Sequence, residues 1–271
     1  MELFPILSVT GSPIAEPQYN VQDFFSSRIV GGIEAPPGYA NYMVALVFGD
    51  LFRYVACGAS IISSTHVLTA AHCIDPFVDF SGNLLPSFRG SLGSNYWEST
   101  QYIINFRGHI NHPAWNRQTI KNDIGILFTR DEIKFNDVIG PIPLKFDHVE
   151  GSIKSFVTGW GDPWLHGPTP DALRLLYTST ITSKQCVADV RNASIHLGSA
   201  PPHDPAVEIC ALHSYGRGMC HGDSGSALVT FDSKEQIGIV SWGFPCARGA
   251  PDMFARVSAY IEWISDVMRN N

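Results

Sequence analysis

Short apolar runs separated by turn-forming residues dominate the chain from Met43 onward, and they limit the folds open to it. Runs of strand length in the first half span residues 43–48, 59–62, 67–70 and 124–129. A second series begins near Ile142 and includes residues 155–161, 208–212, 227–230 and 236–242. Strand-length runs at this spacing predict an antiparallel barrel or sandwich. A chain of 271 residues has room for one large all-β unit or two smaller ones.

Two further segments complete the expected organisation. Residues 75–102 are rich in Gly, Ser, Asn and Pro, which predicts long surface loops. Near the C-terminus, apolar residues recur at the i, i+3, i+4, i+7 spacing of an amphipathic helix: Val257, Tyr260, Ile261, Ile264 and Met268. We expect the apolar stripe of this helix to pack on the strands.

The segment 219–226, Met-Cys-His-Gly-Asp-Ser-Gly-Ser, contains the candidate nucleophile Ser224. A serine hydroxyl is a weak nucleophile unless an imidazole accepts its proton and a third group orients that imidazole. Both groups are available upstream, with His72 in Thr-Ala-Ala-His-Cys and Asp123 in Asn-Asp-Ile-Gly-Ile-Leu. The candidate catalytic residues therefore occur in the order His, Asp, Ser.

These segments resemble those of the trypsin and chymotrypsin family of serine proteases, and the resemblance extends from Arg28 to the C-terminal helix. The α/β-hydrolases are a poorer match, because their order is Ser, acid, His. Their nucleophile is also followed two residues later by glycine, where this chain has Ser226. The resemblance implies an all-β fold of two antiparallel six-stranded β-barrels with a C-terminal α-helix. It assigns residues 29–271 to the protease domain, with the boundary between the barrels near residue 143.

The resemblance also implies roles for single residues. Ser224 would attack the peptide carbonyl, His72 would carry its proton to the leaving amine, and Asp123 would hold the imidazole in the right tautomer. The backbone amides of Gly222 and Ser224 would form the oxyanion hole. Ser241 would support Asp123. The active site would lie in the cleft between the barrels.

The segment Ser-Arg-Ile-Val-Gly-Gly that begins at residue 27 resembles the activation site of the family. Cleavage after Arg28 would create an ammonium group at Ile29, and a buried cation needs a partner. Asp223 is the carboxylate that the resemblance implies, so the chain would be made as a zymogen. We interpret residues 1–28 as a signal remnant and an activation propeptide, and we expect a secreted, extracellular protein.

The specificity pocket departs from the trypsin pattern. Trypsins carry an aspartate six residues before the nucleophile, where this chain has Gly218. Asp252, in Pro-Asp-Met-Phe, falls on the opposite pocket wall, where relatives commonly have glycine. This combination resembles broad-specificity, collagenolytic chymotrypsin-like proteases of arthropods. The segment Ser241-Trp242-Gly243 resembles the one along which substrate lies as an added strand.

Several functions remain open at this point. Apolar pocket walls would favour Phe, Tyr or Leu and give chymotrypsin-like or broad cleavage, whereas Asp252 entering from the side would favour basic residues. A slip of one residue in the alignment across residues 247–250 would turn Asp252 outward. A non-catalytic binding or regulatory homologue is a different class, in which one member of the catalytic set is usually replaced. All three members are present here.

Six cysteines and no CxxC pair favour disulfides and an oxidising compartment, given the resemblance. The resemblance implies three bridges: Cys57–Cys73, Cys186–Cys210 and Cys220–Cys246. Asn192 begins an Asn-Ala-Ser sequon in a polar segment and is a candidate glycosylation site.

Charge and composition count against several other classes. The net charge is −7, with no basic run, no zinc-finger spacing and no phosphate-binding glycine loop, so we expect no nucleic acid partner. No stretch is long and apolar enough to span a membrane. His109 and His112 lie in what reads as a loop and lack a completing carboxylate, so we expect no metal and no cofactor. The expected partners are protein or peptide substrates, an activating protease and protein protease inhibitors.

Overall fold

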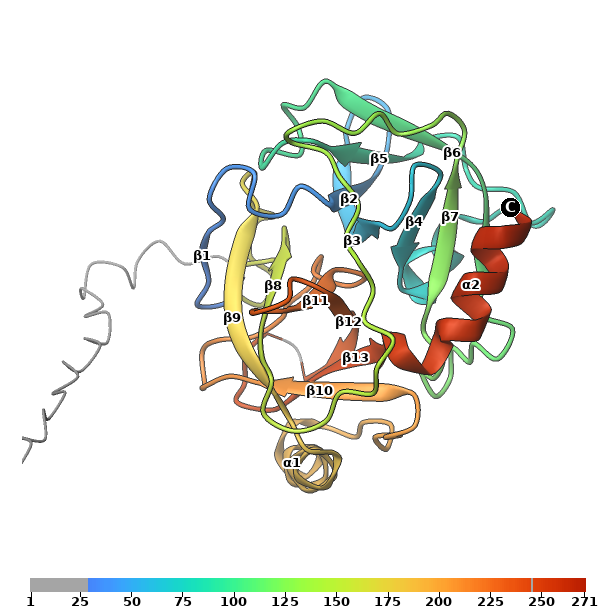
Figure 1. Cartoon of the computed structure of the whole chain (residues 1–271). Helices are drawn as coiled ribbons and strands as arrows, with labels where there is room; N and C mark the ends of the chain where they lie inside the picture. The colour runs from blue at the N-terminus through green and yellow to red at the C-terminus, as the bar shows by residue number, and fades with distance from the viewer. Residues whose placement is uncertain (1–28, 245) are drawn as a thin grey trace, which may run out of the picture.

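Two antiparallel β-barrels lie side by side in the computed structural model, which describes residues 29–244 and 246–271 (Figure 1). Within this part of the chain each barrel is closed by six strands, and a helix ends the chain. The predicted fold class is therefore confirmed. The segment assigned to a signal remnant and propeptide, residues 1–28 including Arg28, lies outside the described residues. No helix in the described ranges has the length and apolarity needed to cross a bilayer.

The first barrel is formed by strands β2 to β7, which pair in the closed order β2-β3-β4-β7-β6-β5. Their bounds are Met43–Phe48, Tyr54–Ile61, His66–Thr69, Phe88–Leu92, Tyr102–Asn111 and Gly125–Thr129. Every residue of β4 and β7 is buried. Both faces of these strands therefore contact protein, which explains why their sequences are continuous apolar runs and do not alternate.

The expectation of long surface loops across residues 75–102 was wrong in part, because β5 lies inside this segment. A Cβ added to Gly90, in the middle of β5, would lie 2.6 Å from the Ile104 side chain and 2.8 Å from that of Val44. Only glycine lets these neighbouring strands approach so closely, so a packed strand has a loop-like composition. His109 lies in β6, and not in a loop as its surroundings suggested.

The second barrel is formed by strands β8 to β13, in the closed order β8-β9-β10-β13-β12-β11, and the short strand β1 (Ile33–Glu34) adds to β9. The bounds of β8 to β13 are Lys154–Gly159, Arg174–Ile181, Glu208–Leu212, Ala227–Thr230, Gln236–Gly243 and Asp252–Arg256. The chain passes from the first barrel to the second between β7 and β8, and residue 143 lies within this connection.

The helix α2 (Ile261–Asn270) follows the last strand of the second barrel but packs on the first, beside β7 (Figure 1). The predicted helix is confirmed, but its buried stripe differs from the predicted one. Residues 257–260 form a 3₁₀ turn, which changes the angular spacing before α2 begins. As a result Ile261 is 38% exposed, and Val267 is buried.

A helix that the sequence analysis did not identify, α1 (Ser183–Leu197), lies between β9 and β10. The Thr182 hydroxyl caps it by accepting a hydrogen bond from the Gln185 amide at 3.2 Å. Only Cys186 and Val190 of its side chains are buried. A helix with so small a buried face has too weak an apolar periodicity to be read from the sequence. Asn192 is exposed on this helix.

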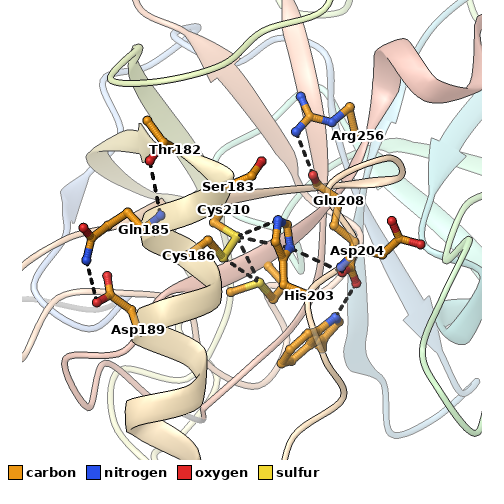
Figure 2. Close-up of a disulfide and its surroundings, with 12 residues drawn as sticks. Thr182, Ser183, Gln185, Cys186, Asp189, His203, Asp204, Glu208, Cys210 and Arg256 are labelled. Atoms are coloured by element: carbon orange, nitrogen blue, oxygen red, sulfur yellow. Dashed lines mark hydrogen bonds and ion pairs between the residues drawn. A yellow bond between two sulfur atoms is a disulfide. The ribbon is translucent and has the colours of Figure 1, made fainter.

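The three cysteine pairs implied by the resemblance are bridged: Cys57–Cys73, Cys186–Cys210 and Cys220–Cys246. The second bridge joins α1 to β10 (Figure 2). The bridges close loops of 16, 24 and 26 residues. Each stabilises the fold by about 2–4 kcal/mol, mainly by restricting the unfolded chain.

Candidate active site

His72 and Asp123 meet at one end of the first barrel. His72 lies in the short 3₁₀ turn that follows β4, and Asp123 precedes β7, the strand paired with β4. The Asp123 side chain is 1% exposed. It accepts hydrogen bonds from the His72 backbone amide at 2.9 Å and from His72 Nδ1 at 2.7 Å. The Ser241 hydroxyl, from β12 of the second barrel, donates to the same carboxylate at 2.5 Å.

This arrangement fixes the electrostatics of the imidazole. Burial disfavours the charged form of His72, but the charge and hydrogen bond of Asp123 outweigh it and raise the pKa of His72 above its usual value. Since Nδ1 donates to Asp123, Nε2 is the nitrogen left to accept a proton. His72, held by Asp123, can therefore accept a proton at Nε2, as a general base must.

Ser224 lies in the loop between β10 and β11, and its position is set by its neighbours. Its carbonyl accepts a hydrogen bond from the Gly58 amide of β3 at 2.7 Å. A Cβ on Gly225 would lie 2.2 Å from the Thr69 hydroxyl and 2.3 Å from the Gly58 carbonyl, at a φ of +80°. The residue after the serine must therefore be glycine for the two barrels to meet here.

Two cavities open on Ser224. The larger, of about 540 Å³, is lined by His72, Gly222 and Tyr54 among others. The smaller, of about 200 Å³, is lined by Trp242 and Asp252 among others. Within the described ranges no hydrogen bond joins the Ser224 hydroxyl to His72, although both residues line the larger cavity. The serine thus lies where the two cavities meet.

The candidate oxyanion donors are available. The backbone amides of Gly222 and Ser224 donate to no other described residue. Asp223, between them, is fully buried and accepts hydrogen bonds from the Gly161 amide at 2.9 Å and the Cys220 amide at 3.0 Å. Burial nevertheless raises the pKa of Asp223 to about 7. No cation contacts this carboxylate among the described residues.

The segment that begins at Ile29 contacts the chain just before the Ser224 loop. Its side chain is fully buried in an apolar cluster with Met219 and Phe254. Val30 pairs with Gly218, and the Gly32 amide donates to the Ile29 carbonyl at 2.8 Å. The segment that follows Arg28 is thus already docked on the second barrel.

Of the two predicted pocket residues Gly218 and Asp252, only Asp252 lines the smaller cavity. Asp252 lines it from the start of β13, and the Met219 amide donates to its carboxylate at 3.1 Å. Burial, together with the charge of Asp223, raises the pKa of Asp252 to about 7. Gly218 is not a lining residue. A Cβ there would lie 3.0 Å from the Asp252 carboxylate, so the glycine makes room for the acid.

Comparison with known proteins agrees with this geometry. The family model Trypsin matches residues 29–264. The chain belongs to the trypsin family. Chymotrypsin-2 of Vespa crabro is 34% identical over 240 residues, which cover 87% of this chain and 98% of the relative. Trypsin-1 of Astacus astacus is 32% identical over 243 residues, with the same coverage. Trypsin I-P1 of Gallus gallus is 28% identical over 274 residues and covers both chains completely.

Membership of the trypsin family makes the chain a chymotrypsin-like serine endopeptidase, as the sequence analysis predicted. Some residues around the site were not identified from the sequence. Tyr54, Asp162 and His221 line the cleft shared by His72 and Ser224. They come from three separate segments. Only His221 lies in a recognised motif, the Ser224 segment 219–226, and no role was predicted for it there.

No metal site was predicted, and the clusters of potential metal ligands among the described residues do not include His109 or His112. In the described part of the chain, the clusters with suitable spacing are Cys57, His72 and Cys73, and Cys186, His203 and Cys210. The cysteines of both clusters are bridged. His112 packs its ring against Tyr260 and Trp263.

Proposed function

We propose that Ser224, His72 and Asp123 form the catalytic triad of this endopeptidase. The observation that carries the proposal is the hydrogen-bonded series from Ser241 through Asp123 to His72, with Ser224 at the junction of two cavities. His72 Nε2 takes the proton of the Ser224 hydroxyl as the oxygen attacks the peptide carbonyl. The same nitrogen then protonates the leaving amine, and a water repeats the cycle on the acyl-enzyme.

The tetrahedral intermediate carries a negative oxygen, which the amides of Gly222 and Ser224 bind. Their lack of other described partners supports this role. Asp123 accepts three hydrogen bonds, two of them from His72, and thereby orients the imidazole and stabilises its imidazolium form.

The chain is made as a zymogen and activated by cleavage after Arg28. The new ammonium group of Ile29 pairs with Asp223, whose buried carboxylate lacks a described cation in the uncleaved chain. The burial of the Ile29 side chain in the same barrel supports this pairing. An activating protease is thus one partner, and protein protease inhibitors are others. The protein acts as a secreted, extracellular enzyme, in agreement with its three disulfides.

The substrate preference is chymotrypsin-like or broad, with Asp252 extending it to basic residues. Apolar side chains and the Asp252 carboxylate line the same pocket, so an aromatic or a basic side chain each finds a partner. A preference for basic residues alone would require the charged form of Asp252 to dominate.

The test is cleavage of a peptide library by protein processed after Arg28, with a Ser224→Ala variant as control. Wild-type protein should cleave after Phe, Tyr or Leu and bind a serine-directed phosphonate covalently. The variant should do neither. If correctly processed, folded wild-type protein neither cleaves nor reacts, the triad assignment is wrong and a binding homologue takes its place.

A further inference from the structure

A buried acidic residue outside the triad, Glu208 of β10, connects two walls of the site. Its side chain is 4% exposed. One carboxylate oxygen, Oε1, accepts hydrogen bonds from Lys121 Nζ at 2.7 Å and from Trp242 Nε1 at 2.8 Å. The other oxygen accepts from the Asp204 amide at 2.7 Å and lies 3.5 Å from His203 Nδ1. Figure 2 shows Glu208 and His203 beside the disulfide of Cys210.

The carboxylate is ionised, although it is buried. Burial alone would favour the neutral acid, but the hydrogen bonds from His203, the Asp204 amide, Lys121 and Trp242 hold the pKa of Glu208 below its usual value. A buried carboxylate is costly unless its oxygens are fully paired. Here both oxygens have partners, so the group acts as a fixed anchor.

The two donors on Oε1 come from opposite barrels. Lys121 lies two residues before Asp123, at the edge of the first barrel, and Trp242 follows Ser241 on β12 of the second. The Lys121 ammonium also lies 5.1 Å from the centre of the Trp242 ring, a cation–π distance. Glu208 therefore joins the two barrels next to the cavity that Trp242 lines.

We propose that Glu208 is a positioning residue, which holds the Trp242 ring, with Lys121 against it, as a wall for substrate residues that precede the scissile bond. The inference rests on the proposed proteolytic cycle at Ser224. It does not extend to the triad, because the three hydrogen bonds that Asp123 accepts come from His72 and Ser241 and none comes from Glu208, Lys121 or Trp242. Loss of Glu208 should therefore weaken substrate binding and leave the chemical step intact.

The experiment compares a short and a long substrate with the same reacting bond, an N-acetylphenylalanine anilide and a tetrapeptide anilide that ends in phenylalanine. In protein processed after Arg28, Glu208→Gln should lower kcat/KM for the long substrate about tenfold, through KM, because hydrogen bonds to a buried charge are lost. Activity on the short substrate should change less than about twofold, since it lacks the residues before phenylalanine that the wall would contact. A merely structural role would lower both in parallel.

Two further variants complete the design. Glu235→Gln is the matched control, because Glu235 also pairs with a lysine, Lys145 at 3.2 Å, but lies outside the site. This variant should leave kcat/KM unchanged for both substrates. Lys121→Met should also lower kcat/KM for the long substrate. It provides the test if Glu208→Gln does not fold.

Each outcome separates the inference from the proposed function. Equal losses on both substrates, a fall in kcat, or no change in folded Glu208→Gln and Lys121→Met would overturn the positioning role alone. If wild-type protein cleaves neither substrate, the proposed cycle fails, and the inference fails with it.

Discussion

The carboxylates that the two barrels contribute to the candidate site differ in their partners. In the first barrel Asp123 accepts three hydrogen bonds, two of them from His72, and one end of the site is already assembled. In the second barrel Asp223 and Asp252 have raised pKa values of about 7, and neither contacts a cation among the described residues. The first half of the site is complete as folded, whereas the second half lacks positive charge. Cleavage after Arg28 would supply that charge to Asp223, and a basic substrate side chain would supply it to Asp252.

The largest effect on activity should come from removing the contact between Asp123 and His72 in the first half of the site. Asp123→Asn should lower kcat about 10,000-fold at neutral pH, because the amide no longer holds His72 in the tautomer whose Nε2 accepts a proton. Steady-state kinetics of the processed protein measures this. Asp75→Asn is the control, since Asp75 also raises the pKa of His72 through its charge but does not contact the imidazole. A loss of similar size in both variants would mean that charge near His72, and not the Asp123 contact, matters.

The lack of a cation beside Asp223, in the second half of the site, should affect the stability of the uncleaved chain. Asp223 has a pKa of about 7 when folded against an ordinary value of 3.8, so the folded state binds the proton more tightly. The resulting stability is present below about pH 4 and is lost as the pH rises through about 7. With about 1.4 kcal/mol for each pKa unit, the loss is at most about 4 kcal/mol.

Urea denaturation of uncleaved protein carrying Ser224→Ala, which prevents self-cleavage, would measure this. The free energy of unfolding should fall between pH 5 and pH 8. Adding Asp223→Asn should remove much of the fall and leave the part due to Asp252, whose pKa is raised in the same direction. A free energy of unfolding that rises with pH would contradict the view that Asp223 is a buried carboxylate without a cation.

The contrast between the halves also explains what the sequence could predict. Local patterns predicted the bounds of β2, β10 and β11, because each is a short apolar run with clear turns on both sides. The ordered motifs predicted that His72, Asp123 and Ser224 belong to one site. They did not predict β5, where Gly90 fits between neighbouring strands, because the reason for that glycine lies in tertiary packing.

The Glu208 cluster was beyond local patterns for a related reason. Its carboxylate meets Lys121 and Trp242 across 87 and 34 residues of sequence, and nothing near Glu208 marks it as a site residue. The raised pKa values of Asp223 and Asp252 likewise depend on burial and on missing partners, which a sequence of residue types does not contain.

The smallest effect, and the finest test of the contrast, concerns substrate choice. Asp252 should be mostly neutral at pH 6 and mostly charged at pH 8, because its pKa is raised to about 7. The ratio of cleavage after Lys or Arg to cleavage after Phe should therefore rise about tenfold across this range, since a buried opposite charge favours the basic side chain.

A ratio is the right quantity to measure. The pKa of His72 is also raised, because Asp123 outweighs burial, but His72 acts on every substrate through the same proton transfer, so its effect on the ratio cancels. Asp252→Asn should make the ratio independent of pH and lower it for basic residues. Asp162→Asn is the matched control, because Asp162 lines the other cleft and also has a raised pKa, caused mainly by burial. A ratio that rises equally in the wild type and in Asp252→Asn would mean that Asp252 does not contact the substrate side chain, and the second half of the site would then need only one cation, the ammonium group at Ile29.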